Sequence, residues 1–405
     1  MSRRGQESPG ISDRRDATGM RLAIDASNAR GGGGLVYLVE LLRAADPLAA
    51  GFDSVTVFGG AALRERIEDR PWLRKAGPAE LDGPLPSRVV WQQLKLPRLL
   101  RRSAFDVLFA PGGTVPRRLP CPAVTVSQNL LPFDERERRR YPPGAVRLRL
   151  ELLRRAQLGS FARADGVIFL SQHARRVLAP QVPGGLRRAV VVPHGVHAGW
   201  QREPPAARGL DACSAESPLR LLYVSIVDEY KHQWNVAQAV AALRREGLPV
   251  EITFAGPAHP PALRRLLTTL DHLDPSRRFL RYTGPVEHGS LRAMYQQAEL
   301  FVFASTCENL PIILIEAMAA GLPIVSSPSG PMPEVLGDAG VYADAENVEE
   351  LTTALRRVAM DADLRDQLAR RAERRSRAYS WAECARRTLA FVAETAAPAA
   401  RWPHG

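Results

Sequence analysis

The sequence predicts an α/β protein of two halves, each built around a parallel β-sheet. Short apolar runs of strand type alternate with stretches whose apolar residues recur at helical spacing, and this alternating set occurs twice. A chain of 405 residues is long for a single hydrophobic core, so two domains are expected. Residues 197–218 separate the two sets. They are polar, contain proline and lack periodicity, which is typical of a linker.

The N-terminal half, residues 21–196, opens with an apolar strand at 21–28. The loop "RGGGG" at 30–34 follows, and then a helix whose apolar residues lie three or four positions apart. Further buried strands are predicted at 54–60, 106–113, 123–129, 166–172 and 189–195. Residues 1–20 are polar and interrupted by glycine and proline, so we expect a disordered tail there.

The C-terminal half, residues 219–380, repeats the alternation. Strands are predicted at 219–226, 250–257 and 278–286, at the end of 291–305, and at 322–330. Residues 381–405 close the chain as a helix followed by a tail. In open parallel sheets ligands bind at the carboxyl ends of the strands, so the site is expected at those ends.

The composition favours anionic partners and an intracellular location. The formal net charge is +12, from 55 Lys and Arg against 43 Asp and Glu, and residues 136–155 alone hold eight arginines against two glutamates. No secretory signal is recognisable, and no run approaches the ~18 uncharged apolar residues that span a membrane. The four cysteines match neither a disulfide framework nor a zinc site. We therefore expect a cytoplasmic protein with free thiols and no bound metal.

Two glutamates, Glu308 and Glu316, bracket the apolar segment "NLPIILI". Pro311 suits the first turn of a helix, and Gly321 is a natural helix end. The residues ahead of Pro311 are therefore expected at a helix N-terminus. Free N–H groups and the helix dipole favour a bound anion there, such as a diphosphate.

The spacing distinguishes two uses of these carboxylates. Glycoside hydrolysis needs two carboxylates roughly 5–9.5 Å apart, whereas eight helical residues rise about 12 Å. The larger separation suits two contacts along one extended ligand, a nucleotide sugar, with Glu308 on the sugar and Glu316 on the ribose. Spacing alone leaves another interpretation open, in which Glu308 only caps the helix and Glu316 faces water.

The stretch "ENLPIILIEAMAAGLPIVSSPSGPMPEVLGDAGVYAD" (308–344) resembles the signature of the group 4, retaining glycosyltransferases. The likeness includes both glutamates, the A-x-G-x-P turn, Glu334 and the pair Gly337 and Gly340. Asn309 and Leu310 stand where the family usually has Gly-Phe-Gly. This "ENLP" form resembles a subset associated with surface-polysaccharide assembly.

The resemblance implies the GT-B fold: two Rossmann-like domains facing a cleft, with the C-terminal helix from Trp381 crossing back to the N-terminal domain. It implies that Glu308 contacts the donor sugar and that Glu316 holds the ribose hydroxyls. It also implies that the amides of Asn309 and Leu310 reach the diphosphate.

A second signature of this family follows the first strand of the C-terminal domain, where Arg and Lys bind the diphosphate. The corresponding segment is "YVSIVDEYKHQ". The resemblance implies that Lys231 binds the diphosphate and acts in catalysis, with Ser225 in the position of a donor-binding glycine. Ile226 replaces the expected arginine, so we expect His232 or an arginine of the N-terminal domain to compensate.

The remaining site predictions are single residues at strand ends. The loop 30–34 is either a flexible turn or a site where the glycine backbone approaches an anion closely. The resemblance implies that this loop packs against the donor phosphate and the acceptor, which points to Gly33 and Gly34. The loop lacks G-x-G-x-x-G, which argues against a nicotinamide cofactor. By resemblance, Gly256, Thr283 and Gly284 border the donor. These three could equally be residues that simply end their strands. Asn129 stands where many relatives carry a histidine and is expected to hold the acceptor without acting as a base. His194 is expected on the acceptor side, although a structural role is the more common one for a single histidine there.

The helix predicted at 145–158 allows two interpretations. Ala145, Leu148, Leu152 and Ala156 line one face, which packs against the core in an ordinary helix. Alternatively, the arginines of 136–155 and these apolar residues form a surface for anionic lipids. Nucleic acid is not expected, because no aromatic residues alternate with the arginines.

The resemblance implies a hexosyl transfer from a nucleoside diphosphate sugar to an acceptor hydroxyl, with retention of configuration, and no cofactor or metal is expected. The expected acceptor is a glycan or a lipid-linked glycan at the inner face of the membrane. Two alternatives remain open. One is a nucleotide-sugar epimerase of the same fold, and the other is a catalytically inactive scaffold that binds a nucleotide sugar or lipid, which the missing arginine favours.

Overall fold

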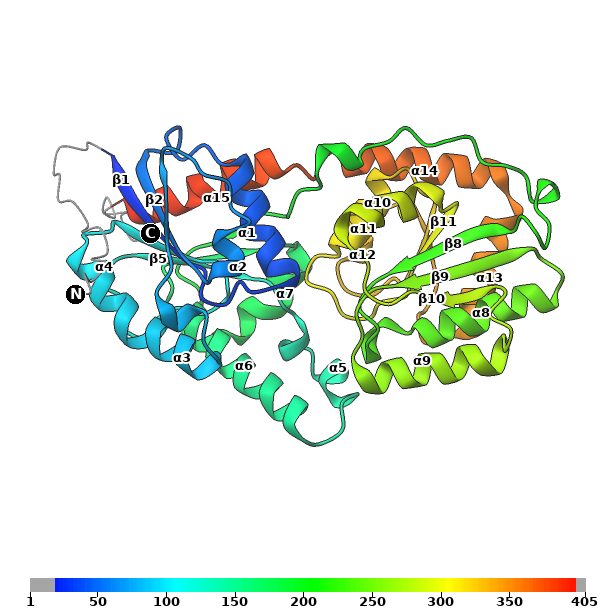
Figure 1. Cartoon of the computed structure of the whole chain (residues 1–405), viewed down its shortest axis with the longest axis horizontal. Coiled ribbons are helices and arrows are strands. Elements are labelled where there is room, and N and C mark those ends of the chain that lie inside the picture. Colours follow the sequence, from blue (N-terminus) through cyan, green and yellow to red (C-terminus); the bar gives the residue numbers. More distant parts are fainter. Residues whose placement is uncertain (1–18, 398–405) are drawn as a thin grey trace, which may run out of the picture.

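The computed structural model describes residues 19–397 and contains two α/β domains side by side (Figure 1). The predicted fold class is confirmed, since each domain has one parallel sheet. The tail predicted for 1–20 lies outside the described residues except for its last two, and Met20 already belongs to the first strand. No helix among residues 19–397 is both long and apolar enough to span a membrane.

Seven parallel strands form the N-terminal sheet, in the order β3-β2-β1-β4-β5-β6-β7. Their bounds are β1 Met20–Asp25, β2 Phe52–Phe58, β3 Leu73–Ala76, β4 Val107–Ala110, β5 Ala123–Ser127, β6 Gly166–Phe169 and β7 Ala189–Val191. The central strands β4, β5 and β6 are wholly buried, which explains their continuous apolar sequences. The sequence did not predict β3. It is an edge strand with the sequence "LRKA", and pairing with β2 rather than apolar patterning places it there.

Helices cover both faces of this sheet. Their bounds are α1 Gly32–Ala44, α2 Ala61–Arg64, α3 Leu85–Val90, α4 Leu96–Arg102, α5 Glu135–Arg139, α6 Ala145–Arg163 and α7 Gln172–Leu178, with short helical turns η1 Ala79–Leu81, η2 Trp91–Lys95, η3 Leu131–Phe133 and η4 Ala179–Gln181. Consecutive residues of β1 point to opposite faces of the sheet. Ile24 belongs to the core that contains α1, and Ala23 belongs to the core that contains η2 and α4.

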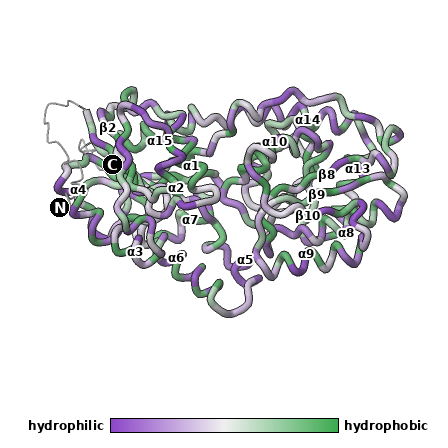
Figure 2. Tube along the Cα trace, viewed as in Figure 1, coloured by the Kyte–Doolittle hydropathy of each residue, from purple (hydrophilic) through white to green (hydrophobic). Residues whose placement is uncertain are grey.

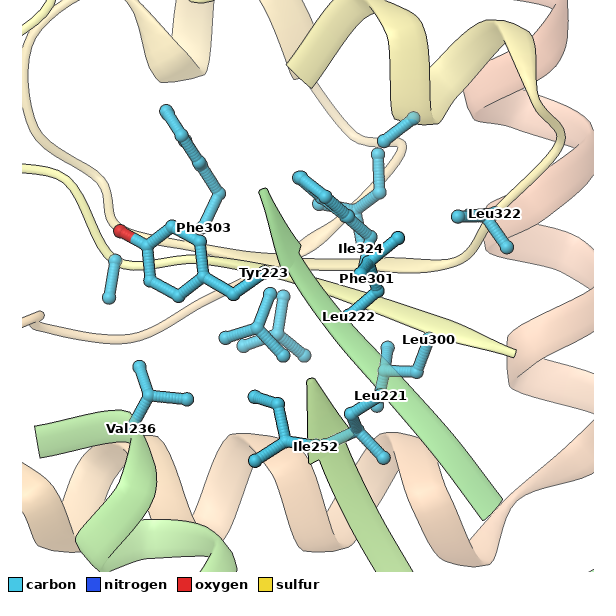
Figure 3. Packing of buried hydrophobic residues seen from close by; sticks show 14 of the residues in the cluster. Leu221, Leu222, Tyr223, Val236, Ile252, Leu300, Phe301, Phe303, Leu322 and Ile324 are labelled. Atoms are coloured by element: carbon cyan, nitrogen blue, oxygen red, sulfur yellow. The ribbon is translucent and has the colours of Figure 1, made fainter. Parts of the chain in front are cut away.

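Six parallel strands form the C-terminal sheet, in the order β10-β9-β8-β11-β12-β13. Their bounds are β8 Leu219–Val224, β9 Val250–Ala255, β10 Leu280–Tyr282, β11 Leu300–Phe303, β12 Ile324–Ser326 and β13 Val341–Tyr342. The accompanying helices are α8 Gln233–Arg245, α9 Pro260–Leu273, α10 His288–Gln297, α11 Ile312–Ala319, α12 Met332–Leu336, α13 Val348–Met360 and α14 Ala362–Ser376, with short turns η5 Ala198–Trp200, η6 Leu210–Ala212 and η7 Glu229–Lys231. Leu222, Tyr223, Phe301 and Phe303 pack with their neighbours in the core of this domain (Figure 3).

The last helix, α15 (Trp381–Ala396), crosses back to the N-terminal domain, as the resemblance implied (Figure 1). Its buried side, including Trp381, Leu389 and Val392, belongs to the core that β1, β2 and α1 share. Hydrophobic residues follow the strands of both sheets, whereas the outer helices mix hydrophilic and hydrophobic residues (Figure 2). Burial of the apolar side of α15 therefore attaches the end of the chain to its beginning.

Candidate functional site

Two loops at the carboxyl end of the C-terminal sheet carry the main candidate residues. One loop follows β8 and contains Lys231, and the other follows β11 and contains Glu308. Because β8 and β11 are neighbours in the sheet, their loops emerge side by side. The backbone N–H of Thr306 donates to the Tyr230 carbonyl at 2.9 Å and joins the two loops directly.

The Lys231 ammonium forms an ion pair with the Glu308 carboxylate. The Lys231 side chain is 4% exposed and that of Glu308 is 14% exposed. The ammonium lies 5.1 Å from the ring centroids of both Tyr230 and Phe303, whose faces attract a cation. A buried ion pair is weak evidence for stability, because desolvation offsets the attraction between the charges. The two residues predicted to act on the donor are thus side by side.

The helix predicted behind Glu308 is present as α11, and Gly321, with φ of +70°, follows its last turn as expected. Pro311 lies at the N-cap rather than inside the first turn. Within residues 19–397, the backbone N–H groups of Asn309 and Leu310 donate no hydrogen bond. Free donors ahead of a helix N-terminus can bind an anion, and here they lie next to the Lys231–Glu308 pair.

Glu316 lies on α11 against α10, where the Tyr295 hydroxyl donates to its carboxylate at 3.2 Å. Burial raises the pKa of Glu316 to about 7, and the Tyr295 hydrogen bond opposes this rise. The side chain is not fully enclosed, so part of it reaches solvent. The sequence left open whether Glu316 faces water or binds a ligand. In the structure its carboxylate accepts one hydrogen bond and remains partly in contact with solvent, so it neither lies freely in water nor has all of its acceptor capacity occupied.

Four predicted donor residues gather at the carboxyl ends of β8, β9 and β10. Gly256, with φ of +140°, packs so closely that a Cβ atom there would lie 2.1 Å from the Ser225 carbonyl oxygen. The Gly256 amide donates to the Gly284 carbonyl at 2.9 Å, and the Thr283 amide donates to the end of β9. A side chain at 256 would force the strand ends apart, which accounts for glycine at this position.

His232, one of the two candidates to compensate for the missing arginine, lies close to the Glu308 loop. This histidine is buried at the N-terminus of α8, and its Nε2 lies 3.2 Å from the Thr306 hydroxyl. Burial, followed by the charge of Arg140, lowers its pKa to about 4. The ring is therefore neutral at physiological pH. That His232 or an arginine of the N-terminal domain compensates for Ile226 stays a prediction. Ile226, at the position of the expected arginine, is exposed.

The N-terminal candidates are less closely grouped. The predicted loop 30–34 is only partly correct, because α1 begins at Gly32 and includes Gly33 and Gly34 in its first turn. A Cβ atom on Gly34 would lie 3.1 Å from Gln128 Oε1, so this turn reaches the residue next to Asn129, whereas a Cβ atom on Gly33 would meet no atom within 4 Å. Asn129 is exposed, and its side-chain Oδ1 accepts the Leu131 backbone N–H at 3.1 Å. The ligand contacts predicted for Gly33, Gly34 and Asn129 stay predictions. The side-chain oxygen of Asn129 already accepts one hydrogen bond within its own turn.

His194 occupies a hydrophobic stack. Its ring lies 4.6 Å from that of Tyr37 and 5.5 Å from that of Trp381, measured between centroids. Burial lowers the pKa of His194 to about 3, so the ring is neutral. Tyr37 lies on α1 and Trp381 on α15, so these ring contacts help to hold the C-terminal helix α15 against the N-terminal domain.

The sequence did not predict which residues join the domains. Tyr141, Ser127 and Ser171 of the N-terminal domain hydrogen-bond to Asp228 or Asn309 of the C-terminal domain. The Glu334 carboxylate, known beforehand only from the family signature, accepts the backbone N–H groups of Gln172 and His173 at 2.7 and 2.9 Å and so caps α7. No spacing rule could have found these pairs, because their partners are far apart in the chain.

The arginine-rich stretch 136–155 divides into two parts. Arg136 and Arg140 pair with Glu346 of the C-terminal domain, so this part joins the domains. Leu148 and Leu152 of α6 are 61% and 56% exposed. The interpretation of α6 as an ordinary core-facing helix is therefore wrong for this face, which points to solvent.

Two further features bear on ligands. A concavity of about 460 Å³ lies between linker residues 201–204 and arginines of α14, and it includes none of the candidate residues. Among residues 19–397, no three His, Cys, Asp or Glu side chains are grouped closely enough to hold a metal ion.

Comparison with known proteins agrees with these features. Residues 218–361 match the family model described as glycosyl transferases group 1, and residues 31–199 match the model of glycosyltransferase family 4. The O-antigen chain mannosyltransferase B of Escherichia coli is 32% identical over 111 residues, which are 27% of this chain and 29% of that protein. The serotype-specific mannosyltransferase WbdA of the same species is 23% identical over 281 residues, 68% of this chain and 33% of its own length. This chain thus covers a third or less of the length of these two relatives.

Two solved structures share the fold. Sucrose-phosphate synthase from Thermosynechococcus elongatus superposes with a TM-score of 0.70 at 19% identity, covering 91% of this chain and 97% of that one. Anabaena HepE, solved in complex with UDP and glucose, superposes with a TM-score of 0.65 at 16% identity, covering 93% and 100%. The two family models cover both domains, and the 308–344 signature begins at Glu308, the partner of Lys231. This chain belongs to the group 4 glycosyltransferases of GT-B fold.

Proposed function

We propose that this protein is a retaining glycosyltransferase that moves a hexosyl group from a nucleoside diphosphate sugar to an acceptor hydroxyl. The observation that carries the proposal is the Lys231–Glu308 pair, which lies beside the free amides of Asn309 and Leu310 and borders the N-terminal domain. A carboxylate suits sugar hydroxyls and an ammonium suits a phosphate. Placed side by side, they fit the two sides of a sugar–phosphate bond.

The comparisons support this choice of substrates. The two Escherichia coli relatives are mannosyltransferases by name, and HepE was crystallised with UDP and glucose. Glu316 would bind the ribose hydroxyls through its partly exposed carboxylate, while Ser225, Gly256, Thr283 and Gly284 would border the nucleotide at the neighbouring strand ends. We assign Gly33 and Gly34 to the donor phosphate, and Asn129 and His194 to the acceptor-facing side.

In the proposed reaction the bond between the anomeric carbon and the diphosphate oxygen breaks, and its electron pair leaves with the diphosphate. The acceptor hydroxyl oxygen forms a bond to the same carbon from the same face, and its proton passes to the departing phosphate oxygen. Lys231 and the free amides stabilise the charge that develops on the leaving group. The protein supplies no nucleophile, and the proposal includes neither a metal nor a cofactor.

Incubation with a panel of nucleotide sugars tests the proposal. We expect a nucleoside diphosphate to be released only when both its donor and a glycan acceptor are present, and the new linkage to keep the donor's anomeric configuration by NMR. Interconversion of the donor sugar without acceptor would instead identify an epimerase. Donor binding without any turnover would identify a scaffold.

The proposal extends to the surface on which the acceptor is presented. Four exposed large apolar side chains lie on α3 and η2 and three on α6: Leu85, Val89, Val90, Leu94, Val146, Leu148 and Leu152. The two regions border one loop, since Arg117 N–H donates to Gln93 of η2 at 2.9 Å and Val115 N–H donates to Ser160 of α6 at 3.2 Å. Within the described chain Arg147 and Arg149 form no ion pair. Apolar side chains beside free arginines suit a bilayer with anionic headgroups, at the cytoplasmic face of the membrane.

The double variant Leu148→Glu/Leu152→Glu should bind anionic vesicles at least about 10-fold more weakly, since each buried leucine contributes about 1.5–3 kcal/mol. Cosedimentation with phosphatidylglycerol vesicles measures this. Leu48→Glu/Met360→Glu, which changes two exposed apolar residues elsewhere, is the matched control. Equal binding of wild type and variant, or wild-type binding no stronger to anionic than to neutral vesicles, would contradict the membrane surface.

A further inference from the structure

Three of the hydrogen bonds that cross the domain boundary end on the two loops that carry Lys231 and Glu308. Tyr141 of the N-terminal domain contacts Asp228, in the loop of Lys231. Ser127 and Ser171 of the same domain contact Asn309, which follows Glu308. Each loop therefore extends from the C-terminal domain and is also hydrogen-bonded to the N-terminal domain.

Tyr141 holds the Lys231 loop through Asp228. Its hydroxyl donates to Asp228 Oδ1 at 2.8 Å, and both residues are buried, at 3% and 8% exposure. The same Oδ1 accepts the Glu229 amide at 2.8 Å, and the Asp228 carbonyl accepts the Lys231 amide at 3.0 Å. Asp228 therefore shapes the turn that carries Lys231, and Tyr141 attaches this turn to the N-terminal domain.

Asn309 holds the Glu308 loop. Its side-chain amide donates to the Ser127 carbonyl at 2.7 Å, at the end of β5, and its own carbonyl accepts the Ser171 hydroxyl at 2.6 Å. Asn309 is buried, with 6% exposure. Glycine, which is usual at this position in the family signature, could not form the first of these bonds. The interdomain hydrogen bond thus gives a physical reason for the asparagine.

We propose that Tyr141 and Asn309 are positioning residues that hold the N-terminal domain closed on the Lys231 and Glu308 loops. The inference rests on the proposed function, because it assumes that those loops bind the donor and the opposing domain binds the acceptor. Closure then sets the distance and direction from which the acceptor hydroxyl approaches the donor. Donor binding within the C-terminal domain does not require either bond.

Tyr141→Phe and Asn309→Ala should each lower kcat by about 10- to 100-fold, the usual effect of losing one buried hydrogen bond, and leave the donor KM nearly unchanged. Because a loss of folded protein would also lower the apparent kcat at unchanged KM, kcat is calculated per folded enzyme, with unfolding measured at Cys384 of the N-terminal core. Tyr342→Phe and Asn235→Ala are the matched controls. Tyr342→Phe removes a hydrogen bond to the Gly337 carbonyl and Asn235→Ala removes one to the Ala345 carbonyl, both within the C-terminal domain. Both variants should keep the kcat and the donor KM of the wild type.

Domain opening can be measured without activity. Cys307 of the C-terminal domain is 4% exposed and packs into an N-terminal cluster with Leu130, Phe133 and Phe169. Cys384 is buried in the other core, where only unfolding exposes it. Alkylation of the full chain by iodoacetamide, followed by mass spectrometry of both peptides, therefore reports opening at Cys307 and unfolding at Cys384. We expect about tenfold faster labelling of Cys307 in Tyr141→Phe and Asn309→Ala, and no change at Cys384.

The results decide separately on positioning and on function. Labelling of Cys307 and kcat that match the controls in both variants would overturn the positioning role while leaving the transferase function intact. If the wild-type protein transfers no sugar, the proposed function fails, and the labelling rates alone decide whether these bonds hold the domains closed. If Asn309→Ala also exposes Cys384, that variant has unfolded, and the result for Tyr141→Phe decides.

Discussion

Replacing Lys231 with alanine is expected to lower kcat about 10³-fold, because the ammonium is the one charge that we assign to the departing diphosphate. Glu308→Ala should have an effect of similar size by removing the contact to the donor sugar. The release of nucleoside diphosphate in the presence of the donor and acceptor found in the substrate panel measures both effects. Full activity of either variant would contradict the assignment of the site.

These single variants also disturb an ion pair, so activity and folding must be separated. Leaving one buried charge without its partner costs about 3–5 kcal/mol, and the unfolding transition of each variant should move accordingly. The double variant Lys231→Met/Glu308→Gln removes both charges and keeps the side-chain volumes. We expect it to regain most of the lost stability and none of the activity. Recovery of turnover along with stability would show that the pair is only structural.

Glu316→Gln should weaken donor binding strongly while making the protein more stable above neutral pH. Burial raises the pKa of Glu316 from 4.5 to about 7 in the folded protein. A raised pKa means that the group favours folding fully below about pH 4.5 and loses this contribution as the pH rises through about 7. Ionised Glu316 therefore disfavours the folded state at pH 8, by at most about 3 kcal/mol for this shift.

Denaturant unfolding of wild type and variant at pH 5 and pH 8.5 tests this sign. The gain in unfolding free energy of Glu316→Gln should be small at pH 5 and larger at pH 8.5, whereas titration calorimetry with the donor should show at least about tenfold weaker binding from the lost charged hydrogen bonds. Glu246→Gln, which changes a surface glutamate paired with Arg356, is the control and should show neither effect. A variant that is less stable at pH 8.5 and still binds the donor would refute the role of Glu316.

The alternation of strands and helices was sufficient to predict the two sheets, because buried parallel strands must be apolar along their whole length. It failed for β3, whose polar sequence "LRKA" becomes a strand through pairing at the sheet edge. It also failed for the apolar face of α6. Helical periodicity shows that Leu148 and Leu152 share a face, but whether that face is covered depends on what the rest of the chain packs against it.

For the candidate site too, the residues could be selected from the sequence, whereas their contacts and charges required the structure. Lys231 and Glu308 were selected from two separate signatures, and the adjacency of β8 and β11 brings them together as an ion pair. The charge of His232 could not be predicted, since its low pKa comes from burial. For Glu316 the sequence showed only a carboxylate among apolar residues, and the structure added the Tyr295 hydroxyl and a pKa of about 7.

By itself the sequence determined the two α/β domains, the helix behind Glu308 and the family signature, because these depend on residues that are close together in the chain. Only the tertiary structure decided how the domains are joined. Tyr141 and Asp228 are 87 residues apart, and Ser127 and Asn309 are 182 apart. A hydrogen bond between such residues leaves no periodicity in either segment, since its geometry exists only after both sheets have formed and their carboxyl ends face each other.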